Sequence, residues 1–410
     1  MNSKIVIIFT TLYLLLGLSA AAGAESIKIG VLSDVTGATA DVGRDYALGV
    51  AEAMRYVNDS GGINGKQIKL YQFDYGYRLP EALTKYKLFR RIKAAAILGW
   101  GTGDTETLSP FVTRDRIPYI SASYSAHLTN PKKTPYNLFA ATDYSSNARA
   151  ALTAWFDIKW PANPDYGRRK PRLQCAYMFE SPFAAAPIKA IKDQAELFGF
   201  VTGPDLNVSL FAIDTRSQVQ ALKSFRPDVV WHGNTTMSVA TTLRDAFAVQ
   251  LKTDHIVNNW GFDENLARLA GQAAEGVMGA SVCAFYAEGA PMMDTVRQYG
   301  RKYNPGVPAS RRLVRTVQAW ASVLALQEAL KRADINGGLT GENILKRGFE
   351  TFDGHDIGLG VPPLTYTPVD HRIAGIVPIY EIRNGNIALL STIDLKSRWP
   401  EEWARDWFGW

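Results

Sequence analysis

Histidine, cysteine and acidic residues most often carry catalysis or hold metals, and in this chain they do not group at a catalytic spacing. No two of the five histidines are four residues apart, the helical spacing of zinc-protease ligands. His355 and Asp356 offer two ligands in one loop, too few for a metal site. GASVC at 279–283 lacks the closing glycine of a hydrolase's nucleophile turn. The sequence therefore predicts a protein that is not an enzyme, with no catalytic residue, metal or cofactor.

Two glycine-rich stretches resemble phosphate-binding loops only in part. GGINGK at 61–66 is one residue shorter than a phosphate loop and is followed by Gln67 where Ser or Thr is required. GWGTG at 99–103 lacks the third glycine of a dinucleotide-binding turn. A turn that ends a helix explains the first stretch better, and we expect no nucleotide cofactor.

Loops at the ends of strands are the elements that would position a site. The pattern predicts strands at 27–32, 67–73, 94–98 and 117–121 that alternate with helices, which indicates a parallel sheet. It restarts with strands at 172–179, 208–213, 228–233 and 255–260, and then shows a helical stretch at 311–333 and a strand-rich region at 361–395. We therefore predict an α/β fold with two Rossmann-like lobes. Ligands bind where parallel strands end, so the predicted cleft is lined by the loops 33–43, 99–107 and 121–129 of one lobe and 180–187, 232–237 and 258–264 of the other.

Length and composition agree with two globular lobes. The chain has 410 residues, 47% hydrophobic and 20% charged, and one core rarely grows beyond about 250–300 residues. The net charge of +6 is mild for this length and the chain contains no long basic run, which argues against nucleic-acid binding. Cys175 and Cys283 are too few for a disulfide framework, and the sequence does not decide whether they are bridged.

The first 24 residues have the features of a cleaved signal peptide. Lys4 precedes the apolar run 5–18, and Ala22-Gly23-Ala24 forms a small-x-small cleavage site. We therefore expect a signal peptide at 1–24, a mature chain that begins at Glu25, and export to the periplasm. An uncleaved membrane anchor is the alternative.

Three stretches together resemble the type I periplasmic solute-binding proteins of ABC transporters, in the branched-chain amino-acid (leucine/isoleucine/valine-binding) branch. They are IKIGVLSDVTGATADVGRDYALGVAEAMRYVNDSGGINGKQIKL, RDRIPYISASYSAHLT, and DVVWHGNTTMSVATTLRDAFAVQLK with HIVNNWGFDENLARLAGQAAEGVMG. The resemblance implies two lobes joined by three hinge strands, with lobe 1 at 27–143 plus 283–353, lobe 2 at 144–282 plus 354–395, and a tail at 396–410. It further implies a monomer that closes on a small-molecule ligand, an amino acid or organic acid, and delivers it to an inner-membrane ABC permease.

The same resemblance implies the ligand-binding residues loop by loop. In lobe 1, groups after the third and fourth strands hold the ligand's carboxylate and amine; in lobe 2, an aromatic residue and a hydroxyl-bearing turn face the ligand. Small hydroxyls and helix N-terminal amides suit an anion. The implied residues are Trp100, Thr102, Gly103, Asp104, Ser123, Tyr124 and Ser125, with Phe183, Thr235, Thr236 and Trp260.

One position departs from the family. The acid that pairs with the ligand's ammonium falls on or next to Trp260, so amino-acid recognition loses its main cation partner, unless Asp104 or Asp263 substitutes. The alternative is an aromatic-walled site that suits a planar or apolar organic acid, or a cation held by ring faces. Its wall would be made by Trp100, Tyr124, Phe183, Trp231 and Trp260.

Two other functions and one structural question stay open at this point. A sensing receptor of the same fold would need no permease, and an exported hydrolase would need a nucleophile and base at the cleft.

In the tail, Trp399, Trp403 and Trp407 are four residues apart, which places them on one face of a helix. That face would pack onto a lobe or contact a permease or membrane.

Overall fold

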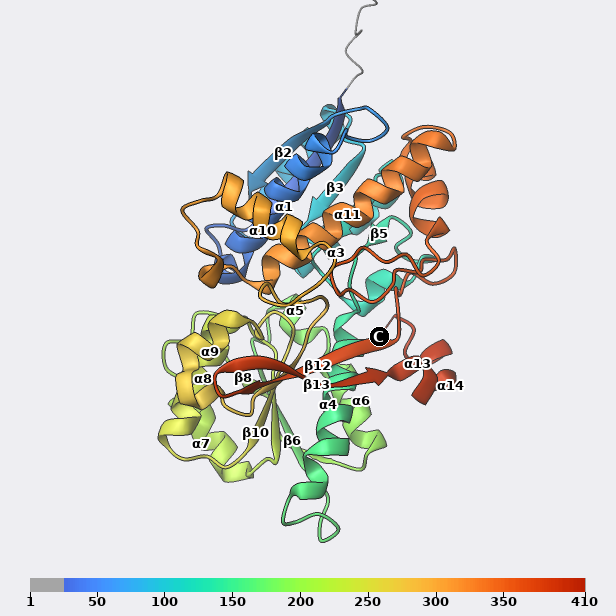
Figure 1. The fold of residues 1–410 in the computed structure, drawn as a ribbon. Helices are drawn as coiled ribbons and strands as arrows, with labels where there is room; N and C mark the ends of the chain where they lie inside the picture. Colours follow the sequence, from blue (N-terminus) through green and yellow to red (C-terminus); the bar gives the residue numbers. More distant parts are fainter. Residues whose placement is uncertain (1–25, 410) are drawn as a thin grey trace, which may run out of the picture.

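The computed structural model describes residues 26–409 and shows two α/β lobes stacked one above the other (Figure 1). The expected α/β class with parallel sheets flanked by helices is confirmed. The predicted signal peptide at 1–24 lies outside the described residues. Within 26–409, no helix is both long and apolar enough to cross a membrane.

The first lobe is built on a parallel five-stranded sheet with the order β2-β1-β3-β4-β5. Strands β1, β3, β4 and β5 are almost entirely buried, as expected where helices cover both faces of a sheet, whereas the edge strand β2 is mostly half-buried. The strands are β1 (Ile27–Ser33), β2 (Ile68–Asp74), β3 (Ala96–Gly99), β4 (Tyr119–Ser121) and β5 (Asn137–Leu138), connected by α1 (Ala40–Asp59), α2 (Leu79–Arg91), α3 (Thr102–Asp115) and the 3₁₀ turn η1 (Ala126–Thr129).

The second lobe contains a larger sheet with the order β13-β12-β11-β10-β9-β6-β7, and β8 pairs with β6. Strands β6 to β11 are parallel, whereas β12 and β13 form an antiparallel hairpin that joins β11. The strands are β6 (Arg172–Tyr177), β7 (Val201–Thr202), β8 (Leu206–Asn207), β9 (Val229–His232), β10 (Asp254–Val257), β11 (Met278–Ala280), β12 (Ile376–Arg383) and β13 (Asn386–Asp394).

Helices pack on the faces of both sheets, and α1 and α11 make an extensive helix pair in the first lobe (Figure 1). Among the described residues the chain passes between the lobes three times: after β5, after β11 and before β12. The remaining helices are α4 (Tyr144–Ile158), α5 (Pro182–Ala185), α6 (Ile188–Leu197), α7 (Arg216–Phe225), α8 (Thr236–Ala248), α9 (Glu264–Ala270), α10 (Met293–Tyr303), α11 (Val314–Ile335), α12 (Gly341–Asn343), α13 (Leu395–Arg398) and α14 (Pro400–Ala404). Single turns complete the set: η2 (Trp160–Ala162), η3 (Gly271–Ala274), η4 (Ala309–Arg311), the π turn η5 (Ile344–Gly348) and η6 (Phe349–Thr351).

One predicted strand does not form, and one predicted strand-rich region is confirmed only in its C-terminal half. No strand forms at 208–213; the edge strand β8 is earlier and has two residues, because Leu210 turns inward while Phe211 and Ile213 are exposed. In the predicted strand-rich region 361–395, strands begin only at Ile376. An apolar run alone does not separate a strand from a loop that buries part of its side chains.

The tail does not form one helix with a tryptophan face. Pro400 starts a new helix, because a proline inside a helix would remove a backbone hydrogen bond. The tryptophans nevertheless pack: Trp403 and Trp407 are buried, and the Arg372 and Arg149 guanidinium groups lie 4.0 and 4.4 Å from their ring centres. The expectation that the tail packs onto a lobe is therefore confirmed.

The two cysteines lie apart in the fold and both are free. Cys175 is on β6 and Cys283 follows β11, and each is buried. The thiol of Cys283 lies 3.9 Å from the carbonyl oxygen of Val314. The question that the sequence left open is thus answered: they are not bridged.

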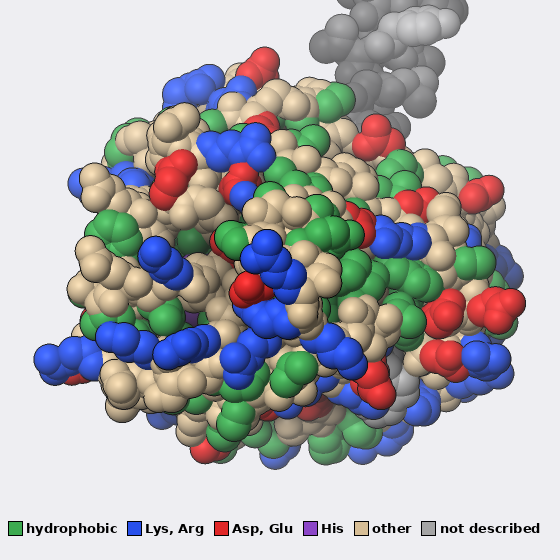
Figure 2. All heavy atoms as spheres, turned by 90° about the horizontal axis from the view of Figure 1, so that it is seen from below, with side chains coloured by type: hydrophobic (Ala, Val, Ile, Leu, Met, Phe, Trp, Pro, Cys, Tyr) green, Lys and Arg blue, Asp and Glu red, His purple; other side chains and the backbone are tan. Residues whose placement is uncertain are grey.

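Basic side chains gather on the face opposite the cleft of the second lobe (Figure 2). The loops that precede the parallel strands of this lobe carry exposed Arg168, Lys170, Arg226 and Lys252. Because parallel strands start at one edge of a sheet and end at the other, this positive surface lies far from the strand-end loops. The excess positive charge of the chain therefore does not surround the cleft.

Two histidines meet on neighbouring strands of the second sheet. His232 ends β9 and His255 lies on β10, and Nε2 of the first is 2.9 Å from Nδ1 of the second. Burial lowers the pKa of both imidazoles, that of His255 to about 4 and that of His232 well below its ordinary value. Both rings are therefore neutral at neutral pH, and one donates a hydrogen bond to the other.

This pair makes the fold sensitive to acid. An unfolded histidine has a pKa of about 6.5, so between about pH 6.5 and pH 4 the unfolded chain binds more protons and the free energy of unfolding falls as the pH falls. Between about pH 7 and pH 5, a His255→Gln variant is expected to lose ~1–2 kcal/mol less stability than the wild type. Urea unfolding at both pH values measures this difference, and equal losses would contradict the assignment.

Candidate functional site

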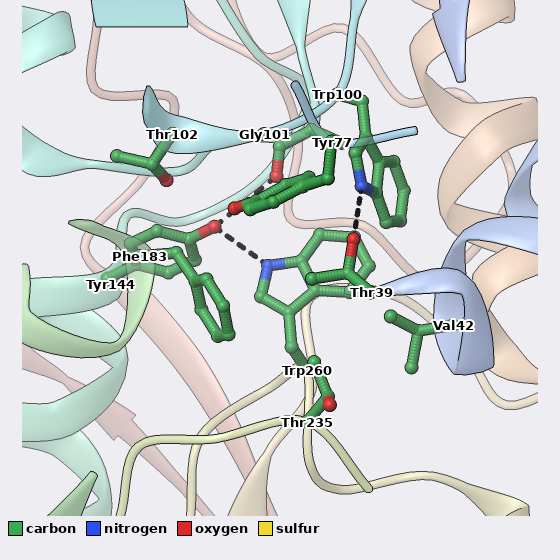
Figure 3. Close-up of a pocket in the computed structure, with 11 residues that line it drawn as sticks. Thr39, Val42, Tyr77, Trp100, Gly101, Thr102, Tyr144, Phe183, Thr235 and Trp260 are labelled. Atoms are coloured by element: carbon green, nitrogen blue, oxygen red, sulfur yellow. Dashed lines mark hydrogen bonds between the residues drawn. The ribbon is translucent and has the colours of Figure 1, made fainter. Parts of the chain in front are cut away.

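A cavity lies between the two lobes, at the ends of the parallel strands (Figure 3). The start of α1 and the loops after β2, β3 and β4 form its wall in the first lobe. The starts of α4, α5 and α8 and the loop after β10 form the rest. The lining residues are Thr39, Val42, Tyr77, Trp100, Gly101, Thr102, Ala122, Tyr144, Phe183, Thr235 and Trp260.

Aromatic rings dominate the wall and join the lobes directly. Trp100, after β3, meets Trp260, after β10, edge to face with ring centres 5.1 Å apart. The indole N–H of Trp260 donates to the hydroxyl of Tyr144 at 2.7 Å, and that of Trp100 donates to Thr39 Oγ1 at 2.8 Å (Figure 3). The hydrogen bonds fix both indoles, so the rings form a rigid wall.

Helix α3 points its N-terminus at the cavity, and the close packing there requires a glycine at position 101. A Cβ on Gly101 would lie 2.4 Å from both Asp104 Oδ1 and the Tyr77 ring, so these groups pack directly against the Gly101 backbone. The Thr102 hydroxyl is 2.8 Å from the Ser123 hydroxyl. Tyr77 has a φ of 56°, an uncommon left-handed conformation for a tyrosine. Such strain is often kept at binding sites.

The cavity is small and its polar groups are uncharged. Its empty volume, with the part open to solvent included, is about 240 Å³, but the enclosed space that a water-sized sphere can occupy is only about 20 Å³, room for about one water molecule. The polar side chains of the lining are hydroxyls of threonine and tyrosine and the indoles of tryptophan. Burial raises the pKa of Tyr144 to about 12, so this phenol keeps its proton at neutral pH.

Comparison with known proteins identifies the family. The model of a family described as "Periplasmic binding protein" matches residues 26–386. The chain belongs to the periplasmic binding protein family. The resemblance to the type I proteins of ABC transporters is thereby confirmed.

Solved structures of periplasmic binding proteins share the fold over nearly the whole chain. An ABC transporter substrate-binding protein from Aeropyrum pernix is 31% identical, with a TM-score of 0.80 over 90% of this chain and 96% of that one. A branched-chain amino acid ABC transporter protein from Thermus thermophilus with bound valine is 23% identical, with a TM-score of 0.82 and the same coverages. A solute-binding protein from R. palustris in complex with benzoate is 16% identical, with a TM-score of 0.73 over 90% and 96%. The last two likenesses show the fold alone.

A curated relative matches over a shorter stretch. The "Amino acid binding protein" of Pseudomonas aeruginosa is 38% identical over 85 residues. The match spans 20% of this chain and 22% of that protein. It agrees with the family but is too short to assign the relative's ligand to this chain.

In this periplasmic binding protein, the structure brings some of the sequence-predicted residues to the cavity and places others behind it. The lining includes Trp100, Thr102, Phe183, Thr235 and Trp260. The other predicted residues do not line the cavity: Gly103, Asp104, Ser123, Tyr124, Ser125 and Thr236. Trp231, part of the alternative aromatic wall, is buried on β9.

The residues behind the cavity support its wall. Tyr124 stacks on Trp260 with ring centres 5.6 Å apart. Ser125 Oγ is 3.1 Å from Nδ1 of His127, which is not one of the lining residues. Thr236 donates to Asp263, which caps α9 and pairs with Arg315 at 3.1 Å. Asp263 is therefore occupied and does not replace the missing acid.

Other lining residues were not predicted from the sequence. Thr39 caps α1 and Ala122 follows β4, and both lie in loops that the pattern had assigned to the cleft. Tyr77 and Tyr144 lie outside those loops, after β2 and at the first turn of α4. Tyr77 follows a parallel strand, so the same rule for strand-end loops could have found it. Tyr144 lies at the start of α4, where the chain crosses between the lobes, and its position carries no local signal.

Removing the Tyr144 hydroxyl is expected to weaken both the fold and the site. A Tyr144→Phe variant leaves the buried indole N–H of Trp260 without its acceptor, which costs about 1–3 kcal/mol of stability. The variant also removes the hydrogen bond that fixes the Trp260 indole in the cavity wall. Solute affinity should therefore fall about tenfold. Tyr366→Phe is the matched control, because that buried hydroxyl donates to the Phe139 carbonyl at 3.0 Å, away from the cavity. If both variants bind solute like the wild type, Tyr144 does not hold the wall.

Proposed function

We propose that this protein is the exported solute receptor of an ABC importer. A signal peptide at 1–24 would direct it to the periplasm, where it would act as a monomer. A small organic solute binds between the lobes, the lobes close on it at the three crossings, and a membrane permease receives it from the closed form. The solute leaves chemically unchanged.

One observation carries this proposal: the cavity wall is made by both lobes, which touch across it. Trp100 of the first lobe and Trp260 of the second share an edge-to-face contact. A ligand between them gains contacts in the closed form that it lacks in the open form, and so shifts the equilibrium toward closure. Family membership and the transporter relatives support the same role.

The lining supports a solute with an apolar or aromatic body and few polar groups. Trp260 occupies the region where the branched-chain amino-acid branch is expected to hold the ligand's ammonium with an acid, and most of the large side chains that line the cavity are aromatic. Valine and benzoate, bound by two proteins of this fold, are both small solutes with an apolar or aromatic body. An amino acid with the usual acid-paired ammonium fits this wall less well.

A thermal-shift screen of purified protein tests the proposal. The panel contains amino acids, aromatic acids, amides, short carboxylates and amines. We expect at least one solute to bind at about 1:1, to raise the melting temperature in proportion to occupancy and to reduce the radius of gyration in solution scattering. Chemical turnover of that solute, or scattering that does not change on binding, would contradict the proposal. Cell fractionation and N-terminal sequencing test export, with Glu25 as the expected first residue.

A further inference from the structure

The cavity wall resembles a cage for a positive charge. Five of its eleven lining residues are aromatic: Tyr77, Trp100, Tyr144, Phe183 and Trp260. Figure 3 shows them around one space, contributed by loops of both lobes. Ring faces attract cations, and tryptophan does so most strongly. Alkylammonium groups, which are weakly hydrated and rounded, are the ligands that such cages hold.

A buried carboxyl lies directly behind this cage. Asp104 is 2% exposed, and its Oδ1 packs against the backbone of Gly101, a lining residue. It accepts hydrogen bonds from the hydroxyls of Tyr75 at 2.6 Å and Tyr119 at 3.3 Å. Tyrosine hydroxyls from β4 and the segment after β2 therefore face it, and among the described residues it forms no ion pair.

Asp104 also takes the place that an anionic ligand would use. Its carboxyl accepts from the backbone N–H groups of Gly101 and of Asp104 itself, at the N-terminus of α3. These amides are the anion-binding feature of a helix start. A ligand carboxylate at this end of the cavity would meet a carboxyl already in position, whereas a ligand cation would complement it.

The other charged groups near the wall also favour a cationic ligand. Asp34 lies behind Thr39 and accepts from its hydroxyl at 2.7 Å, and Asp41 lies beside Thr235 and accepts from the Met237 N–H at 3.3 Å. Arg315 lies 5.0 Å from the Trp260 ring, but Asp263 balances its charge. Of these described groups, the carboxyls of Asp34, Asp41 and Asp104 therefore outnumber the single guanidinium of Arg315.

We propose that the solute carries a permanent or protonated alkylammonium group, that the aromatic cage holds this group, and that Asp104 is its counter-charge. The inference rests on the proposed function and names the class of solute. Asp104 acts through the wall as a specificity-determining residue and selects cations over anions.

This assignment makes affinity depend on pH with a definite sign. Burial raises the pKa of Asp104 to about 7, so its carboxyl is about half ionised at neutral pH. A cation binds more tightly to the ionised form and lowers the pKa on binding, so affinity rises as the pH rises. If the cation lowers the pKa by about one unit, affinity increases about fivefold from pH ~6 to pH ~8.

The test compares choline with 3,3-dimethylbutan-1-ol, which has carbon in place of the nitrogen, and with benzoate. Choline keeps its charge at every pH, so any pH dependence of its binding comes from the protein. Calorimetry is expected to show choline binding at least about tenfold more tightly than its carbon analogue and about fivefold more tightly at pH ~8 than at pH ~6. Benzoate should bind more weakly than choline.

Two variants separate the role of Asp104 from a general effect of pH. Asp104→Asn keeps the shape of the protonated acid and should bind choline equally at both pH values. Glu264→Gln is the matched control: burial raises the pKa of Glu264 to about 7 as well, but it accepts from the backbone of Val314 and Tyr286 and does not line the cavity. This variant should keep the wild-type pH dependence.

The outcomes distinguish this inference from the proposed function. Equal binding of choline and its carbon analogue, or binding of benzoate without choline, would overturn the cationic class. Choline binding with the same affinity at both pH values would overturn the role of Asp104. In each case a solute from the wider screen that closes the lobes would leave the receptor function standing, whereas failure of every solute would count against the function itself.

Discussion

Replacing Trp260 with alanine is expected to reduce solute affinity by at least about a hundredfold. The indole forms one side of the cavity, contacts Trp100 across the lobes and stacks on Tyr124. Each aromatic contact contributes about 0.5–1.5 kcal/mol beyond the area it buries, and about 2.8 kcal/mol corresponds to a hundredfold change in affinity. The change also opens the wall to water and releases the Tyr144 hydroxyl from its donor.

Trp160→Ala is the matched control for this prediction. Trp160 is as buried as Trp260 and stacks on Trp155, but it lies in η2 and does not line the cavity. Both variants should lose about 3–5 kcal/mol of folding stability, the usual cost of truncating a buried tryptophan. Only Trp260→Ala should lose solute binding, measured by calorimetry at a temperature where both variants are folded. Wild-type affinity in Trp260→Ala would show that the solute binds elsewhere.

Breaking the buried ion pair between α1 and the segment before α11 is expected to cost as much stability as truncating a buried tryptophan. Arg312, next to the start of α11, donates through two nitrogens to the Glu52 carboxylate at 2.9 and 2.7 Å, and both side chains are almost completely buried. The Arg312 Nε also lies 3.3 Å from Asp45. Arg312→Met leaves Glu52 charged and without this partner, a change that costs about 3–5 kcal/mol.

Chemical unfolding measures this loss, and two further variants show its origin. Lys346→Met removes a partner from an exposed pair with Glu342 and should leave stability unchanged, because solvent screens such pairs. Arg312→Met combined with Glu52→Leu removes both charges and should recover part of the loss. If the double variant is as unstable as the single one, lost packing rather than the stranded carboxylate is the cause.

The fold follows from local patterns to a large extent. The apolar runs at 27–32, 94–98 and 228–233 each form a buried strand, because a strand covered on both faces needs apolar side chains throughout. The strand predicted at 208–213 does not form: Val208 and Leu210 are buried but Phe211 and Ile213 are exposed, and an apolar run alone does not separate a strand from a loop. The single helix predicted from the spacing of Trp399, Trp403 and Trp407 does not form, because Pro400 interrupts it.

The site was predictable at the level of loops rather than side chains. Parallel strands of one sheet end at one edge, so the loops after β3 and β4 had to meet in the first lobe and those after β9 and β10 in the second, and each contributes to the lining. Within one loop, however, neighbours differ: Trp100 and Thr102 face the cavity, whereas Gly103 and Asp104 do not. Successive residues of a helix point in directions about 100° apart, and the orientation of α3 against the sheet decides which of them reach the cavity.

The sequence by itself determined the two α/β lobes, the edge at which their loops converge and the absence of an acid at Trp260. Only the tertiary structure decided that Asp263 is held by Arg315 of α11, that Tyr144 belongs to the wall, and that Asp104 lies behind it. Periodicity records which side chains are buried near their neighbours in sequence. A contact between residues 50 or more positions apart depends on how whole elements pack, and no local pattern encodes that geometry.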